Sequence, residues 1–121
     1  MTSLYERIGG EAAIMAAVGI FYKKVLADDL TRPFFTELDM DKQTQKQIAF
    51  MAWALGGPSE YKGRDLREAH APLVQRGLDD VHFAAVVRHL KSTLEEIGVS
   101  PADVNEALAI VGGTKGQVLN R

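Results

Sequence analysis

The fold class is decided by residues 79–101, DDVHFAAVVRHLKSTLEEIGVSP, whose apolar positions recur three and four residues apart. This period is typical of an amphipathic helix that turns one face toward a core. Asp79 precedes the pattern as an expected N-cap, and Gly98 follows it where a left-handed residue ends a helix most easily. The stretch therefore predicts a helix whose buried face is formed by Phe83, Val86, Val87, Leu90, Leu94 and Ile97.

Helical signals continue on both sides of this stretch. Ser100 and Pro101 are expected as the N-cap and the first residue of a last helix. Asp39 and Asp41 are expected to open a helix that runs to Gly56-Gly57, because their charges favour the positive end of its dipole. A further helical face is formed by Ile14, Val18, Phe21, Tyr22 and Val25. No segment alternates as a strand does, so we predict an all-α fold of about five helices.

The composition fits a single globular domain over residues 1–121. Hydrophobic residues make up 46% of the chain and charged residues 25%, and no linker or repeat divides it. The net charge of -2 offers no basic surface for nucleic acid, and no apolar run approaches the roughly 18 to 20 residues of a membrane span. We expect a soluble, cytoplasmic protein. The chain has no cysteine, which excludes disulfide frameworks, iron–sulfur clusters, thiolate zinc sites and cysteine nucleophiles.

His70 is the first candidate for chemistry, because it shares a predicted helical side with Leu66 and Leu73. An inward imidazole is either a core histidine with a polar partner or a ligand for something bound. Pro72 follows two residues later, and a proline is tolerated in the first turn of a helix. Residues 58–68 are polar and read as a loop. We therefore expect His70 at the start of a short helix.

Two amides form a second candidate, because Gln43 and Gln47 lie four residues apart and Met51 and Leu55 continue the same row. The row is either a hydrated first turn followed by core residues, or a buried stripe. In the second case the amides need a hydrogen-bonding partner, and a polar ligand is one. Lys46 lies beside them and is expected to be a solvated cation.

Aromatic residues and the other histidines are weaker candidates. Tyr22 reads as a core tyrosine whose hydroxyl has a backbone partner. Phe34 and Phe35 read as core, or as a wall for a flat cofactor. His82 and His89 lie beside the apolar stripe of their helix and are expected to face solvent. Their spacing does not support a zinc or non-haem iron site.

Seven elements, taken together and in order, resemble the group I truncated haemoglobins, which are 2-over-2 globins. The resemblance runs from about Leu4 to the end of the chain. It rests on Gly9-Gly10, Phe21-Tyr22, Phe34-Phe35, the stretch from Gln43 to Gln47, Leu55-Gly56-Gly57-Pro58, Ala69-His70 and His82-Phe83. The resemblance implies a truncated globin, a two-over-two helical sandwich around haem b.

The resemblance also implies roles for individual residues. His70 corresponds to the proximal iron ligand, while Tyr22, Gln43 and Gln47 correspond to residues that stabilise the distal ligand. Lys46 has two expected roles: ligating iron as a neutral amine, or pairing with a haem propionate as a cation. The residues expected to contact the cofactor are Phe34, Phe35, Lys46, Met51, Tyr61, Leu66, Phe83, Val86 and Leu90.

The implied function is reversible binding of O2 and other diatomic gases, NO and CO, by a monomer. The alternative is nitric oxide dioxygenase activity, for which an external reductase is expected, because no flavin or nicotinamide module is recognisable in the chain. A third hypothesis is a haem-free helical binding module, in which all these residues belong to the core.

Overall fold

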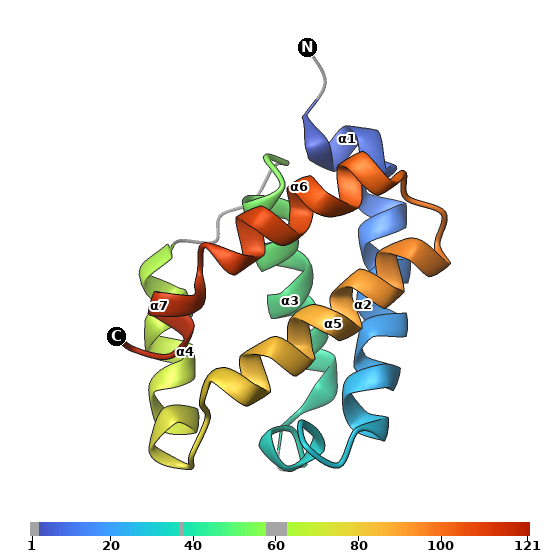
Figure 1. Ribbon diagram of the computed structural model, residues 1–121. Helices are drawn as coiled ribbons and strands as arrows, with labels where there is room; N and C mark the ends of the chain where they lie inside the picture. Colours follow the sequence, from blue (N-terminus) through green and yellow to red (C-terminus); the bar gives the residue numbers. More distant parts are fainter. Residues whose placement is uncertain (1–2, 37, 58–62) are drawn as a thin grey trace.

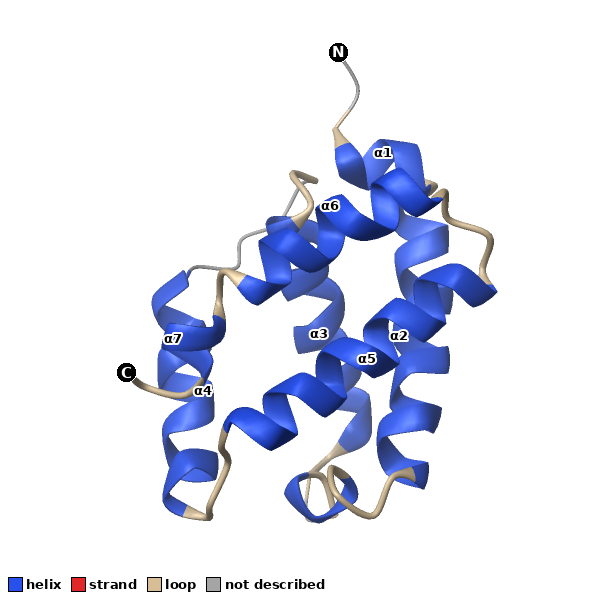
Figure 2. Ribbon diagram, viewed as in Figure 1, coloured by secondary structure: helices blue, strands red, loops and turns tan. Residues whose placement is uncertain are grey.

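The computed structural model describes residues 3–36, 38–57 and 63–121, with residues 63–65 described through their backbone alone. All regular structure in these ranges is helical (Figure 2). The elements are α1 (Leu4–Ile8), α2 (Gly10–Ala27), the 3-10 helix η1 (Arg32–Phe34), α3 (Met40–Ala54), α4 (Gly63–Gln75), α5 (Asp80–Glu96), α6 (Pro101–Gly112) and α7 (Lys115–Val118). The all-α prediction is confirmed. The predicted number of about five helices is too low, because elements as short as α7 show no repeating apolar face from which they could be predicted.

The predicted helix boundaries are confirmed by their caps. The carboxylate of Asp79 accepts a hydrogen bond from the first amide of α5, and Gly98 follows that helix with φ +87°. The hydroxyl of Ser100 caps α6, which begins at Pro101. The carboxylate of Asp39 accepts from two amides in the first turn of α3. Local polar chemistry therefore sets where these helices begin.

The helices form two crossed layers. Helix α2 packs against α3 and α5, and α6 packs against α5. In Figure 1, α5 and α6 run in front of α2 and α3, two helices over two. Helix α4 stands at one side with α7 against it. None of the described helices combines the length and the apolar character that crossing a bilayer requires.

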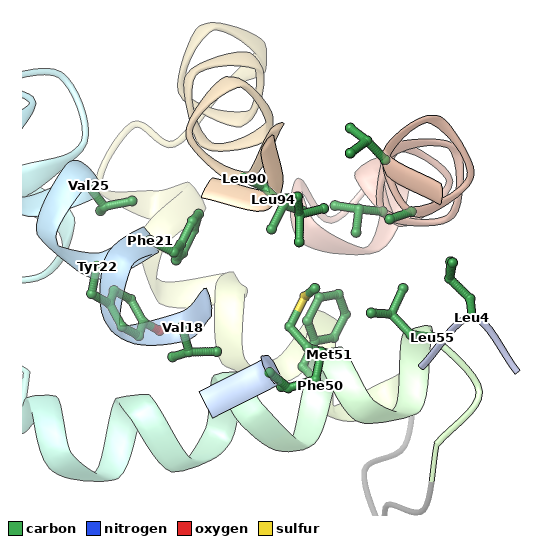
Figure 3. Close-up of a cluster of buried hydrophobic side chains, with 14 of the residues drawn as sticks. Leu4, Val18, Phe21, Tyr22, Val25, Phe50, Met51, Leu55, Leu90 and Leu94 are labelled. Carbon is green, nitrogen blue, oxygen red and sulfur yellow. The ribbon is translucent and has the colours of Figure 1, made fainter. Parts of the chain in front are cut away.

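The core lies between the two layers and is shown in Figure 3. Helix α2 supplies Val18 and Phe21, α3 supplies Met51, and α5 supplies Leu90 and Leu94. Of the predicted face of α5, Leu90 and Leu94 are buried, whereas the remaining members are partly exposed. Two of those, Phe83 and Val86, face a cavity described below.

The expected start of the His70 helix is wrong. Helix α4 begins at Gly63, so residues 63–68 are helical and His70 lies in the middle of the helix. Pro72 is inside α4, where it deprives the carbonyl of Glu68 of an amide partner. The helix ends three residues later, at Gln75, so few hydrogen bonds follow the interruption. A proline near the C-terminal end of a helix is thus tolerated here as well as one in the first turn.

Two glycines test the packing. A Cβ added to Gly57 would lie 2.5 Å from Cγ of Tyr5, whereas one added to Gly19, in the middle of α2, would meet nothing within 4 Å. We expect Gly57→Ala to lower the free energy of unfolding by roughly 1–3 kcal/mol through overpacking. Gly19→Ala should raise it by roughly 0.5–1 kcal/mol through helix propensity. Urea unfolding followed by circular dichroism measures both, and changes of the same sign would contradict the packing.

Candidate functional site

A cavity of about 640 Å³ is lined by residues of α4 on one side and of α2, α3 and α5 on the others. Its volume is within the roughly 300–1,000 Å³ typical of ligand sites. Most of the lining is apolar, with a few polar side chains among it. Of the residues expected to contact a cofactor, eight line it: Phe34, Phe35, Lys46, Met51, Leu66, Phe83, Val86 and Leu90. The ninth, Tyr61, lies outside the described residues.

The polar lining comes from separate elements. His70 is contributed by α4, whereas Tyr22 comes from α2 and both Gln43 and Gln47 come from α3. Helix α4 stands apart from α2 and α3 (Figure 1). The cavity therefore brings together every residue predicted to hold iron or to stabilise its ligand.

The imidazole of His70 has a defined tautomer. Its Nδ1 lies 2.7 Å from the carbonyl oxygen of Leu66, one turn earlier in α4. Because a carbonyl oxygen only accepts, Nδ1 carries the proton, and in the neutral ring Nε2 keeps its lone pair. Burial lowers the pKa of His70, and the bond to Leu66 offsets this only in part. The ring therefore offers the cavity a neutral nitrogen with a free lone pair.

Tyr22 is held as a hydrogen-bond donor. Its side chain is only 5% exposed, and its ring packs against Phe21 and edge-on against Phe35, at 5.3 and 5.8 Å between centroids. Burial raises the pKa of Tyr22 to about 12, so the phenol stays protonated. The hydroxyl donates to the main-chain oxygen of Gln43 at 3.4 Å, which is long for such a bond. The expected backbone partner is present, yet this weak bond leaves the proton available to a ligand.

The side chains of α3 divide between the cavity and solvent. Gln43 and Gln47 are half-buried and line the cavity, so the row is not simply a hydrated first turn. Lys46 is exposed and also reaches the lining, which places it at the edge of the cavity. The two amides supply donors and acceptors at a partly desolvated wall.

The prediction that His82 and His89 face solvent is wrong. His82 accepts a hydrogen bond from the amide of Asp79 at Nδ1, which completes a capping box for α5. Its ring lies edge-on to Phe34, with centroids 4.8 Å apart. The Nε2 of His89 lies 2.8 Å from a carboxylate oxygen of Asp28, next to the end of α2. Both rings are half-buried because distant segments pack over them, which helical spacing does not reveal.

Several lining residues were missed by sequence reasoning. Thr31 is buried with its hydroxyl donating to the carbonyl of Val25 at 2.7 Å, and Thr114 is buried in the same way against the carbonyl of Val111. Val111 and Val118 line the cavity from the C-terminal helices. Their seven-residue spacing was the available signal, but α7 is too short to show a period.

A helical sandwich around an apolar cavity, with a neutral histidine on one wall and a protonated phenol on another, defines a globin-type site. A family model described as bacterial-like globin matches residues 3–120. A group 1 truncated hemoglobin of Chlamydomonas moewusii is 53% identical over 118 residues, covering 98% of this chain and 68% of that protein. Another, from Synechocystis, is 44% identical over 124 residues and covers both chains entirely.

Solved structures agree with this similarity. The 2/2 hemoglobin of Synechococcus, in the cyanomet state with covalently attached heme, has a TM-score of 0.94 at 47% identity, covering 99% of this chain and 100% of that chain. The Fe(III) truncated hemoglobin of Tetrahymena pyriformis has a TM-score of 0.90 at 44% identity, covering 98% of each. Three variants of that protein, substituted at one tyrosine or at one of two glutamines, have the same TM-score of 0.90. The chain belongs to the bacterial-like globin family and, within it, to the group 1 truncated hemoglobins. Membership implies a haem cofactor and the binding of gases.

The neutral state of His70 has a measurable consequence in haem-free protein. Because the folded protein lowers the pKa of this base, the unfolded chain binds more protons at pH values just below its ordinary pKa of about 6.5. The contribution of His70 to the free energy of unfolding is complete above the ordinary pKa. It is lost as the pH falls through the lowered pKa of the folded protein. We expect the unfolding free energy of wild type to drop more than that of His70→Gln between about pH 8 and pH 5. Equal drops would show that His70 is not held neutral.

Proposed function

We propose that this protein reversibly binds O2 on the iron of a haem b held by His70. The observation that carries the proposal is the pairing, in one cavity, of a neutral imidazole with a buried phenol that stays protonated. Bound haem supplies a ferrous iron with an open coordination position that accepts a diatomic gas. The residues of this chain hold that group, exclude water and donate hydrogen bonds to the gas.

His70 supports the proposal through its ring nitrogens. Nε2 is the nitrogen left free for iron, and the Nδ1 bond to Leu66 orients the ring and raises its basicity as a ligand. The apolar lining suits the porphyrin faces. Cysteine is absent from the sequence, so thioether attachment of the c type is excluded and the b type is inferred.

Tyr22, Gln43 and Gln47 are proposed as the residues that stabilise the bound gas. They line the same cavity, and the Tyr22 hydroxyl has a long bond that it can exchange for a better acceptor. The replaced tyrosine and glutamines of the Tetrahymena protein have the same spacing, 21 and then 4 residues, as Tyr22, Gln43 and Gln47 here. This agreement supports the assignment of all three.

The same pocket accepts NO and CO as well as O2. No feature of the described residues favours nitric oxide dioxygenase activity over reversible binding. Ferric iron needs an electron source to return to the ferrous state, and no flavin or nicotinamide module is recognisable in the sequence, so an external reductase is part of the proposal.

Replacing Tyr22 tests the donor directly. A hydrogen bond to a charged acceptor contributes roughly 1.5–3 kcal/mol, so its loss should speed O2 release by about tenfold to a hundredfold. We expect Tyr22→Phe to show this increase in stopped-flow dissociation, because the ring packing is kept and only the hydroxyl is removed. Gln43→Glu and Gln47→Glu serve as comparisons that keep the size of each side chain. A Tyr22→Phe rate equal to that of wild type would remove Tyr22 from this role.

Lys46 is proposed as the partner of a haem propionate. Its side chain is exposed at the edge of the cavity, where it can meet a propionate, whereas ligation of iron would require a neutral amine within the cavity. Ferric spectra of wild type and Lys46→Ala, recorded from about pH 5 to pH 10, are expected to titrate alike. A low-spin form that is present in wild type, fades as the pH falls and is missing in the variant would instead make Lys46 the sixth ligand.

A further inference from the structure

The helix that carries His70 is held by few elements. Among the described elements, only α7 packs extensively against α4. Figure 1 shows α7 lying along α4, at the side of the molecule away from α2. At its C-terminal end α4 has one further attachment, because the guanidinium of Arg76 donates to the carbonyl of Pro33 at 2.8 Å and lies over the ring of Phe34. The preceding part of α4 therefore depends on α7 for its position.

Residues 115–121, which we call the C-terminal clasp, bind α4 through polar contacts. The side-chain amide of Asn120 donates to the main-chain oxygen of Arg67 at 3.2 Å. The guanidinium of Arg67 donates back to the main-chain oxygen of Arg121 at 3.3 Å. Asn120 has φ +58°, a left-handed conformation that asparagine tolerates better than most residues. Arg67 lies one turn before His70 on α4, so these contacts hold the helix next to the ligand.

The same clasp binds the start of α5 through charge. The guanidinium of Arg121 lies 2.7 Å from a carboxylate oxygen of Asp79 and 2.7 Å from one of Asp80. The amine of Lys115 lies 2.9 Å from the same Asp80 oxygen. Arg121 and then Lys115 lower the pKa of Asp80 to about 2, so the Asp80 carboxylate stays charged throughout the neutral range. Salt, not mild acid, is therefore the condition that weakens the contacts of Asp80.

The clasp also forms part of the cavity wall. Within the clasp, Leu119 is buried and Val118 lines the cavity. A displacement of the clasp would thus change both the wall and the helix that carries His70.

We propose that the C-terminal clasp positions His70, with Asn120 and Arg121 as positioning residues that fix α4 against the start of α5. The proposal rests on the proposed function in one respect: His70 is taken as the iron ligand. An isolated exposed ion pair contributes little, but here one arginine contacts two carboxylates while the adjacent residue bonds to α4. These contacts act together because the clasp connects α4 with the start of α5, and both helices line the cavity.

Hydrogen exchange on the full-length protein as purified tests the proposal. Asn120→Gly removes the side-chain bond to the main-chain oxygen of Arg67 while keeping the positive φ, and Arg121→Gln removes the charge. Arg7→Gln is the matched control, because Arg7 is similarly exposed and also contacts two carboxylates, Asp103 and Glu106, far from α4.

We expect amides of residues 66–75 to exchange about three- to fivefold faster in both clasp variants, the size expected for an exposed charged network, and not in the control. Raising NaCl to about 1 M, where the Debye length is about 3 Å, should also speed exchange of these amides in wild type. It should not speed their exchange in Arg121→Gln, which has already lost the charge.

A second readout links the clasp to the cofactor. Transfer of ferric haem to an excess of a haem-free acceptor globin should be about three- to fivefold faster from the two clasp variants than from Arg7→Gln. Faster exchange confined to the first turn of α5, with α4 unchanged, would overturn the proposal and leave Arg121 as a local support for that helix start. Unchanged exchange everywhere would overturn it too. Protein that binds no haem would contradict the proposed function, while the exchange comparison would still decide the role of the clasp.

Discussion

The hydrogen bond from Nδ1 of His70 to the carbonyl of Leu66 is the interaction on which the site depends. It joins two residues one turn apart in α4, so the helix itself brings the two groups close together. By occupying Nδ1 it leaves Nε2 as the free nitrogen, and burial keeps the ring neutral. Without that bond the imidazole would have no preferred tautomer or orientation. The apolar cavity would then offer a flat cofactor no defined axial ligand.

The remaining features give the cavity two different sides. On the side of α4 a neutral nitrogen offers a lone pair, and on the side of α2 a buried phenol offers a proton. Burial lowers the pKa of His70, because it disfavours the imidazolium cation, and raises the pKa of Tyr22, because it disfavours the phenolate anion. One physical cause, desolvation in an apolar cavity, therefore leaves a neutral nitrogen on one wall and a protonated phenol on another. The amides of Gln43 and Gln47 add polarity to the second wall only.

Much of this arrangement could be predicted from local sequence, and each failure has its own physical cause. The period of residues 79–101 and the caps at Asp39 and Ser100 specified helices whose ends the structure confirms. Pro72 was misread, because a local rule that places proline at helix starts ignores how near the other end lies. The partners of His82 and His89 come from segments that only tertiary packing brings close. The cavity lining from α7 was missed because that helix is too short to show a repeating apolar face.

The central claim is that His70 holds haem iron, and absorption spectroscopy of the purified protein titrated with haem tests it most directly. Wild type should develop a Soret band that saturates at one haem per chain, and His70→Ala should abolish it. His89→Ala is the control, because His89 is also half-buried and hydrogen-bonded but does not line the cavity. It should retain the wild-type band. A band that survives unchanged in His70→Ala, or its absence from wild type, would contradict the claim.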